Sequence, residues 1–162
     1  MITIRRAGDL DARQMADLLN AIIEKGGTTA HTNPLTGRTI LDWMRRDPDR
    51  SAWHVAEDET GHILGFQFVE PHCDLPPEAC DIASFVRLGQ TGLGVGSKLF
   101  DASRAAAKDL GYLWINATIR ADNCGGLAYY QSRGFEDYAH HPKQRLGNGE
   151  LVDKVSKRYD LR

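Results

Sequence analysis

The residues best suited to bind a ligand lie in a short glycine-rich stretch, Gly89–Ser97. Four of its first eight positions are glycine, namely 89, 92, 94 and 96. Glycine lets a backbone approach a ligand closely and turn its N–H groups toward it. Apolar residues at helical spacing follow, from Val95 to Leu110, so the loop leads into a helix whose N-terminus carries partial positive charge. The stretch therefore predicts a site for a phosphate or pyrophosphate. A tight strand-to-helix turn without a ligand is the alternative.

Two common phosphate-binding motifs do not fit this loop. A P-loop requires Gly-Lys followed by Ser or Thr, whereas here Lys98 comes after Ser97. A dinucleotide-binding fingerprint requires Gly-x-Gly-x-x-Gly and an acidic residue about 20 positions later. The loop has glycines at 92, 94 and 96, and the later segment 112–116 contains no acid. An enzyme that binds a nucleotide through this loop is therefore disfavoured.

The elements that position the loop are predicted by hydrophobic periodicity and turn signals. Helices are expected from Asp9 or Asp11 to Gly26, with Gln14 completing a capping box with Asp11, and then over 38–46, 95–110 and 123–132. Strands are expected near 2–6, 51–57, 62–70, 81–88 and 113–119, from about 134, and over 150–159 after the turn signal Asn148-Gly149. The order β-α-α-β-β-β-α-β-α-β-β predicts an α/β fold with a mixed sheet. Neither a linker nor a repeat divides the chain, so we expect a single domain over 1–162.

Composition excludes several classes of protein. The chain has 162 residues, 41% of them hydrophobic, and a formal net charge of −2. That balance gives no electrostatic case for a nucleic acid or an anionic membrane as partner. Neither a membrane-spanning apolar run nor a secretory signal is evident, so we expect a cytoplasmic protein. Three scattered cysteines, at 73, 80 and 124, suggest free thiols.

Two motifs resemble those of a known family. The stretch Val86-x-Leu88-x-x-Thr91-Gly92-Leu93-Gly94-Val95-Gly96-Ser97-x-Leu99 resembles the pyrophosphate-binding motif of the GNAT superfamily of acetyl-CoA-dependent N-acetyltransferases. Thr91 departs from that motif, because it stands where the family usually has Gln or Arg. The stretch Asn123-x-x-Gly126-Leu127-x-Tyr129-Tyr130-x-x-x-Gly134-Phe135 resembles the family's later motif. Together the motifs span about residues 80–136, in the order and on the elements that the family uses.

The resemblance implies a GNAT fold, a mixed and mostly antiparallel twisted sheet with helices on both faces. It also implies acetyl transfer from acetyl-CoA, as co-substrate, to the primary amine of a small molecule or amino-acid-like acceptor. The phosphinothricin-type branch is the most similar. Apart from the resemblance, the late hairpin could join two subunits into a homodimer. The acceptor pocket is expected to come from about Gly26–Thr39 and from the late strands, which include His140 and His141.

Site residues are likewise carried over from the family. The backbone at Phe85, Val86 and Leu88 is expected to hold the pantetheine arm and polarise the thioester. The pyrophosphate is expected on Thr91, Gly92, Leu93, Gly94, Val95, Gly96 and Ser97, with Asn123 capping its helix or touching the cofactor. Tyr130 stands at the position of the family's proton donor, an aromatic core residue being the alternative. Asp81 stands where phosphinothricin-type members carry a catalytic Glu, a solvated strand end being the alternative.

Several rival assignments stay open. Glu70 is a second candidate base, unless it is a surface charge at the sheet edge. Cys124 as a covalent nucleophile and a metal at His72, Cys73 or Cys80 are both disfavoured, and we expect no metal. A non-catalytic sensor of acyl-CoA and acetylation of a peptide or protein amine are the alternative functions.

Overall fold

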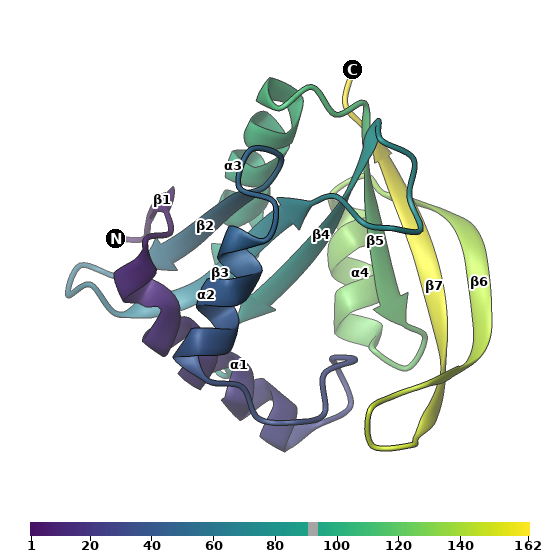
Figure 1. Cartoon of the computed structure of the whole chain (residues 1–162), viewed down its shortest axis with the longest axis horizontal. Helices are drawn as coiled ribbons and strands as arrows, with labels where there is room; N and C mark the ends of the chain where they lie inside the picture. The colour runs from purple at the N-terminus through teal and green to yellow at the C-terminus, as the bar shows by residue number, and fades with distance from the viewer. Residues whose placement is uncertain (91–93) are drawn as a thin grey trace.

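Figure 1 shows a computed structural model of the chain, which describes residues 1–90 and 94–162. Its elements follow the predicted order: β1 (Thr3–Arg6), a 3-10 turn (Asp9–Asp11), α1 (Ala12–Lys25), α2 (Gly37–Arg45), β2 (Ala52–Glu57), β3 (Ile63–Glu70), β4 (Ala79–Val86), α3 (Val95–Asp109), β5 (Trp114–Arg120), α4 (Cys124–Ser132), β6 (Glu136–Arg145) and β7 (Leu151–Asp160). In these two ranges, no helix is both long enough and apolar enough to cross a bilayer.

The seven strands form one sheet with the order β1-β2-β3-β4-β5-β7-β6. Neighbouring strands are antiparallel except β4 and β5, which run parallel. The β4–β5 ladder covers only Ala79–Asp81 against Trp114–Asn116. Beyond that point β4 stays paired with β3 as far as Val86, while β5 follows β7. The two central strands therefore diverge, as Figure 1 shows, and leave the β5-facing edge of β4 open.

Helices cover both faces of the sheet, as predicted. Helices α1 and α2 lie on one face, where Met15 and Leu19 pack on Phe66 and Phe85. Helix α3 covers the other face and α4 lies beside it; Phe100 of α3 and Tyr130 of α4 share a core with β4 and β5. This two-sided burial explains why β3 is buried along its whole length, since both sets of alternating side chains face a helix layer.

The start of α1 differs from the prediction. The Asp11 carboxylate accepts a hydrogen bond from the Gly8 amide at 2.7 Å and pairs with Arg5 at 2.8 Å, so it caps the preceding 3-10 turn. Gln14 accepts a hydrogen bond from the amide of Ile63 on β3 at 3.1 Å. The predicted capping box between Asp11 and Gln14 is therefore wrong, because partners on β1 and β3 engage both side chains.

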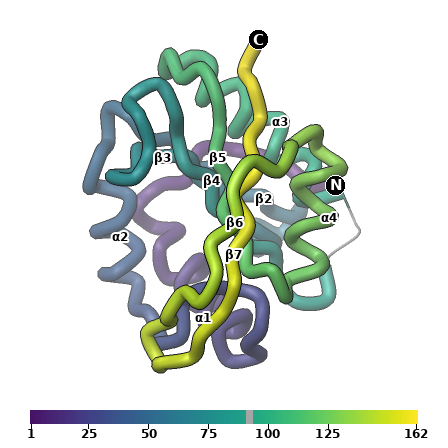
Figure 2. Tube along the Cα trace, turned by 90° about the vertical axis from the view of Figure 1, so that its right-hand side faces the viewer, coloured from purple at the N-terminus to yellow at the C-terminus, as the bar shows by residue number. Residues whose placement is uncertain are grey.

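The last two strands form a long hairpin at the end of the sheet, which Figure 2 shows side by side. Its turn lies at Asn148-Gly149, as predicted, with Gly149 in the left-handed region (φ 87°). The Gly149 amide donates to the carbonyl of Leu146 at 2.9 Å, which closes the turn. The hairpin brings β6 and β7 side chains to the space opened between β4 and β5.

Candidate active site

A cavity of about 1110 Å³ lies where β4 and β5 diverge. Its walls include residues of the α1–α2 loop, β3, β4, β5, the start of α3, α4 and the β6–β7 hairpin. Seven of the residues predicted from the sequence line it: Asp81, Phe85, Val86, Leu88, Gly96, Asn123 and Tyr130. The divergence of two strands thus brings together residues from both motifs.

The open edge of β4 supplies backbone groups to this cavity. Among residues 1–90 and 94–162, Phe85 and Val86 pair with β3 on one side only. The Phe85 ring packs on Phe66 beneath α1, with ring centroids 5.1 Å apart, so the side chain is core. Leu88, just past the strand, is 43% exposed. At Phe85 and Val86, therefore, the groups of β4 that can bind a ligand are chiefly the backbone N–H and C=O groups on the edge facing β5.

The described part of the glycine loop forms the N-terminus of α3. Gly94 is the N-cap residue and has φ 82°, a left-handed conformation that glycine adopts without strain. Val95 is 1% exposed and packs with Leu99, so its side chain belongs to the core. Thr91, Gly92 and Leu93, also predicted to hold the pyrophosphate, lie outside the described residues.

Helix α4 packs directly against this helix start. The hydroxyl of Tyr129 donates to the carbonyl of Gly96 at 2.7 Å. A Cβ at Gly96 would lie 2.8 Å from Cε1 of Tyr129, closer than real Cβ contacts allow. Arg133 donates to Oγ of Ser97 at 2.8 Å. At Gly96, therefore, the requirement for glycine comes from packing against Tyr129.

Asp81 lies at the point where the β4–β5 ladder ends. Its Oδ1 accepts a hydrogen bond from Nδ2 of Asn116, its partner on β5, at 2.9 Å. Oδ1 of Asn116 in turn accepts from the hydroxyl of Tyr138 on β6, which fixes the direction of the amide. Burial raises the pKa of Asp81 to about 6, although the Asn116 hydrogen bond lowers it. Asp81 is therefore a half-buried carboxyl group whose pKa is raised toward neutral, and the solvated-strand-end alternative is wrong.

Glu70 stands beside Asp81 on the neighbouring strand, as its register partner. It is 7% exposed, so it is not a surface charge. Both of its carboxylate oxygens are bound by the Arg46 guanidinium, one of them by Nε at 3.0 Å. This bidentate pair occupies the lone pairs that a base would use. Of the two carboxylates, Asp81 is better placed to accept a proton.

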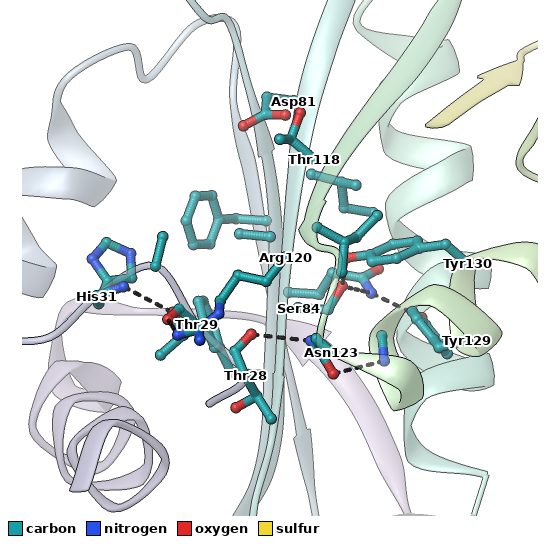
Figure 3. A pocket seen from close by; sticks show the side chains of 18 of the residues that line it. Thr28, Thr29, His31, Asp81, Ser84, Thr118, Arg120, Asn123, Tyr129 and Tyr130 are labelled. Atoms are coloured by element: carbon teal, nitrogen blue, oxygen red, sulfur yellow. Dashed lines mark hydrogen bonds between the residues drawn. The ribbon is translucent and has the colours of Figure 1, made fainter. Parts of the chain in front are cut away.

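Tyr130 lies on α4 and lines the cavity. Its hydroxyl lies 2.7 Å from Oγ of Ser84, and Figure 3 shows the two side chains next to each other. Tyr130 is 6% exposed, and burial raises the pKa of its phenol well above the ordinary value. The phenol is therefore protonated at neutral pH. It is packed in the core and also lines the cavity, so the two interpretations of this residue are compatible.

Asn123 has a double role. Its Oδ1 accepts from the amide of Gly126 at 3.0 Å, which caps α4 as predicted, and its Nδ2 donates to the carbonyl of Thr28 at 3.0 Å. Arg120 of β5, which is 5% exposed, donates to the carbonyl of Thr29 at 3.1 Å. These bonds connect the α1–α2 loop to the end of β5 and to the start of α4, as can be followed in Figure 3. The loop thereby forms one wall of the cavity.

The family follows from a comparison with known proteins. The model of the Acetyltransferase (GNAT) family matches residues 15–135. This chain is a member of the GNAT family. Membership confirms the prediction of an acetyltransferase with a mixed, mostly antiparallel sheet.

Individual GNAT proteins resemble the chain over most of its length. YwnH of Bacillus subtilis (strain 168), a proposed phosphinothricin acetyltransferase, is 25% identical over 163 residues, which cover 99% of this chain and 96% of the relative. The phosphinothricin N-acetyltransferase of Streptomyces viridochromogenes is 26% identical over 136 residues, 83% of this chain and 74% of the relative. The crystal structure of a GNAT superfamily phosphinothricin acetyltransferase from Sinorhizobium meliloti, in complex with acetyl-CoA, superposes with a TM-score of 0.88 at 18% identity and covers 99% of this chain and 88% of that chain.

The rest of the GNAT cavity is lined by the α1–α2 loop and the late hairpin. The α1–α2 loop lines it through Thr28, Thr29, Ala30 and His31, and the late hairpin lines it through His141, Gln144, Lys154 and Ser156. His31 stacks on Trp43 with ring centroids 5.0 Å apart. His140 points to Asp153 on the outside of the hairpin, 3.9 Å away.

Two disfavoured candidates lie at the surface, although His72 and Asp74 of the second also line the cavity. Cys124 is exposed and is not among the residues that line the GNAT cavity. Ligand atoms of His72, Cys73 and Asp74 lie within 4.8 Å of one another. All three residues are exposed, and Nδ1 of His72 accepts a hydrogen bond from the Asp74 amide at 3.1 Å. These contacts describe a surface turn.

Sequence reasoning missed the polar residues that hold the two candidate catalytic groups, Asn116 beside Asp81 and Ser84 beside Tyr130. The available signal was a polar residue inside an apolar strand, since Asn116 stands between Ile115 and Ala117. A buried polar group requires a hydrogen-bond partner, but the sequence does not say which one.

Proposed function

We propose that this GNAT protein transfers the acetyl group of acetyl-CoA to the primary amine of a small molecule or amino-acid-like acceptor. The observation that carries the proposal is the cavity between β4 and β5, lined by a carboxyl group of pKa about 6 and by a protonated phenol. The similar structure from Sinorhizobium meliloti is a complex with acetyl-CoA, and both relatives are named as phosphinothricin acetyltransferases, which supports the donor and the class of acceptor.

The donor fits the described residues on two counts. The free edge of β4 at Phe85 and Val86 presents peptide groups that suit an extended arm bearing amides. The α3 N-terminus, beginning at Gly94, presents N–H groups that have no partner within the helix and a positive dipole end, both of which suit a pyrophosphate. Thr91, Gly92, Leu93, Gly96, Ser97 and Asn123 complete the binding site that we propose.

In this reaction Asp81 accepts a proton from the attacking amine, directly or through a water. Acetyl-CoA supplies the acetyl group as a thioester, whose carbonyl would be polarised by a free β4 amide. Tyr130 gives its proton to the departing sulfur. Loss of the Asp81 proton to solvent and reprotonation of Tyr130 then restore the protein, so the products are an N-acetylated acceptor and CoA.

The test begins with calorimetric titration of acetyl-CoA, with desulfo-CoA, ATP and NAD as comparators. Binding of the two CoA compounds alone supports the proposed donor, whereas binding of ATP or NAD without CoA contradicts it. An amine panel, followed by CoA release, then tests turnover. Tyr130→Phe should lower kcat by about 10²- to 10⁴-fold and leave acetyl-CoA affinity nearly unchanged, because only the proton donor is removed. CoA binding without turnover of any amine or peptide would identify an acyl-CoA sensor instead.

A further inference from the structure

The proton donor in the proposed reaction faces an energetic problem. An ordinary phenol has a pKa of about 10 and an ordinary thiol one of about 8.5, so transfer from phenol to thiolate is uphill by roughly thirtyfold in equilibrium. Burial of Tyr130 raises its pKa and enlarges that deficit. The titratable groups that face this phenol are Tyr129 from its own helix and Asp81 from β4, and both raise its pKa further. A hydrogen bond donated to the developing phenolate would lower this cost.

Such an interaction is available from Ser84, whose Oγ lies 2.7 Å from the Tyr130 hydroxyl. Ser84 Oγ also lies 2.7 Å from Nε2 of Gln67, the residue opposite it on β3. Gln67 is 0% exposed, so this contact lies in the protein interior. The three side chains form a line of hydrogen bonds that ends on the phenol.

The direction of these hydrogen bonds follows from Tyr129. Its hydroxyl hydrogen is committed to the carbonyl of Gly96, so toward Gln67 this hydroxyl can only accept. Gln67 must therefore present its NH₂ group, which donates to Tyr129 at 3.0 Å and to Ser84. Since Ser84 accepts from Gln67, its own hydrogen is free to point at the Tyr130 oxygen.

We propose that Ser84, oriented by Gln67, is a positioning residue that donates a hydrogen bond to Tyr130 as Tyr130 gives up its proton. The inference rests on the proposed function. In the step concerned, the Tyr130 O–H bond breaks, an S–H bond forms on CoA, and the phenolate oxygen keeps the electron pair. The Ser84 hydroxyl then stabilises that oxygen by a charge-assisted hydrogen bond, which strengthens as the charge develops.

The test is a double-mutant cycle on kcat, with Ser84→Ala and Tyr130→Phe singly and together. Hydrogen bonds to charged groups predict a fall of about ten- to a hundredfold in kcat for Ser84→Ala, with KM for acetyl-CoA unchanged. In the Tyr130→Phe background, the same replacement should have little further effect, because no phenolate forms there. Ser84→Thr, which keeps a hydroxyl, should recover most of the lost rate.

Ser132→Ala is the matched control, since it removes an exposed serine hydroxyl that donates to the backbone of Tyr129 on the same helix. It should leave kcat unchanged. An equal fall in both backgrounds, a rise in KM with kcat retained, or an unchanged Ser84→Ala enzyme would overturn the inference while leaving the proposed function intact. A wild-type protein that turns over no amine would overturn both.

Discussion

Replacement of Asp81 by Asn removes the proposed base with almost no change in shape. At a pKa of about 6, roughly nine-tenths of the carboxyl groups are ionised at pH 7 and roughly one-tenth at pH 5. The wild-type kcat/KM should therefore fall about tenfold for each pH unit below about 6, because the protonated carboxyl cannot accept a proton. A general base contributes about 10²- to 10⁴-fold, so Asp81→Asn should lower kcat/KM by that factor. It should also remove this fall at low pH, the acid limb of the pH–rate profile.

The neighbours of Asp81 predict how the limb should move. Asn116 lowers the pKa of Asp81 through its hydrogen bond, so Asn116→Ala should shift the limb to higher pH. Glu70 raises that pKa through its negative charge, whereas Arg46 and His72 lower it. Glu70→Gln should therefore keep the limb and shift it to lower pH. The two replacements should therefore shift the pKa of Asp81 in opposite directions.

The assay is loss of thioester absorbance across about pH 5 to 9, with the acceptor held at low concentration. An amine acceptor itself loses a proton over this range, so profiles are compared between variants and not interpreted from one curve. Acetyl-CoA titration of each variant controls for folding and donor binding. The assignment of Asp81 as the base would be refuted if Asp81→Asn kept both its rate and the fall in rate at low pH. It would also be refuted if Glu70→Gln lost that fall.

Two further predictions concern the packing that supports the site. Gly96→Ala should destabilise the protein by about 1–3 kcal/mol in chemical denaturation, because its Cβ would lie 2.8 Å from Tyr129. Tyr129→Leu should relieve most of that penalty, and strict additivity of the two replacements would contradict this reasoning. Asn123→Ala should cost about 1 kcal/mol by removing the α4 cap, whereas Asn123→Asp keeps the acceptor for Gly126 and should cost less. Only the side-chain amide of Asn123 can donate to the carbonyl of Thr28, and both variants lack it. Hydrogen exchange in the α1–α2 loop should therefore be faster in both variants than in the wild type. Unchanged exchange in both would contradict a stabilising role for this contact.

The sequence by itself determined the features that depend on near neighbours. The order of helices and strands, the end of α1 at Gly26, the turn at Asn148-Gly149 and the cap at Asn123 all follow from residues within about four positions. The two motifs predicted the family, since each is a pattern along one continuous segment. These local rules also placed Asp81 and Tyr130 on the correct elements.

The tertiary structure alone decided which side chains meet. Gln67 and Ser84 are 17 residues apart in sequence, Asp81 and Asn116 are 35 apart, and Ser84 and Tyr130 are 46 apart. Their contacts depend on strand register and on the point where β4 leaves β5, which no local pattern encodes. Contacts with β1 and β3 overrode the predicted capping box of Asp11 and Gln14. The exposed Arg46, 24 residues away in sequence, pairs with the buried Glu70. Energies of contacts across the sheet are as large as local preferences, so the assembled fold sets the protonation and orientation of each group in the site.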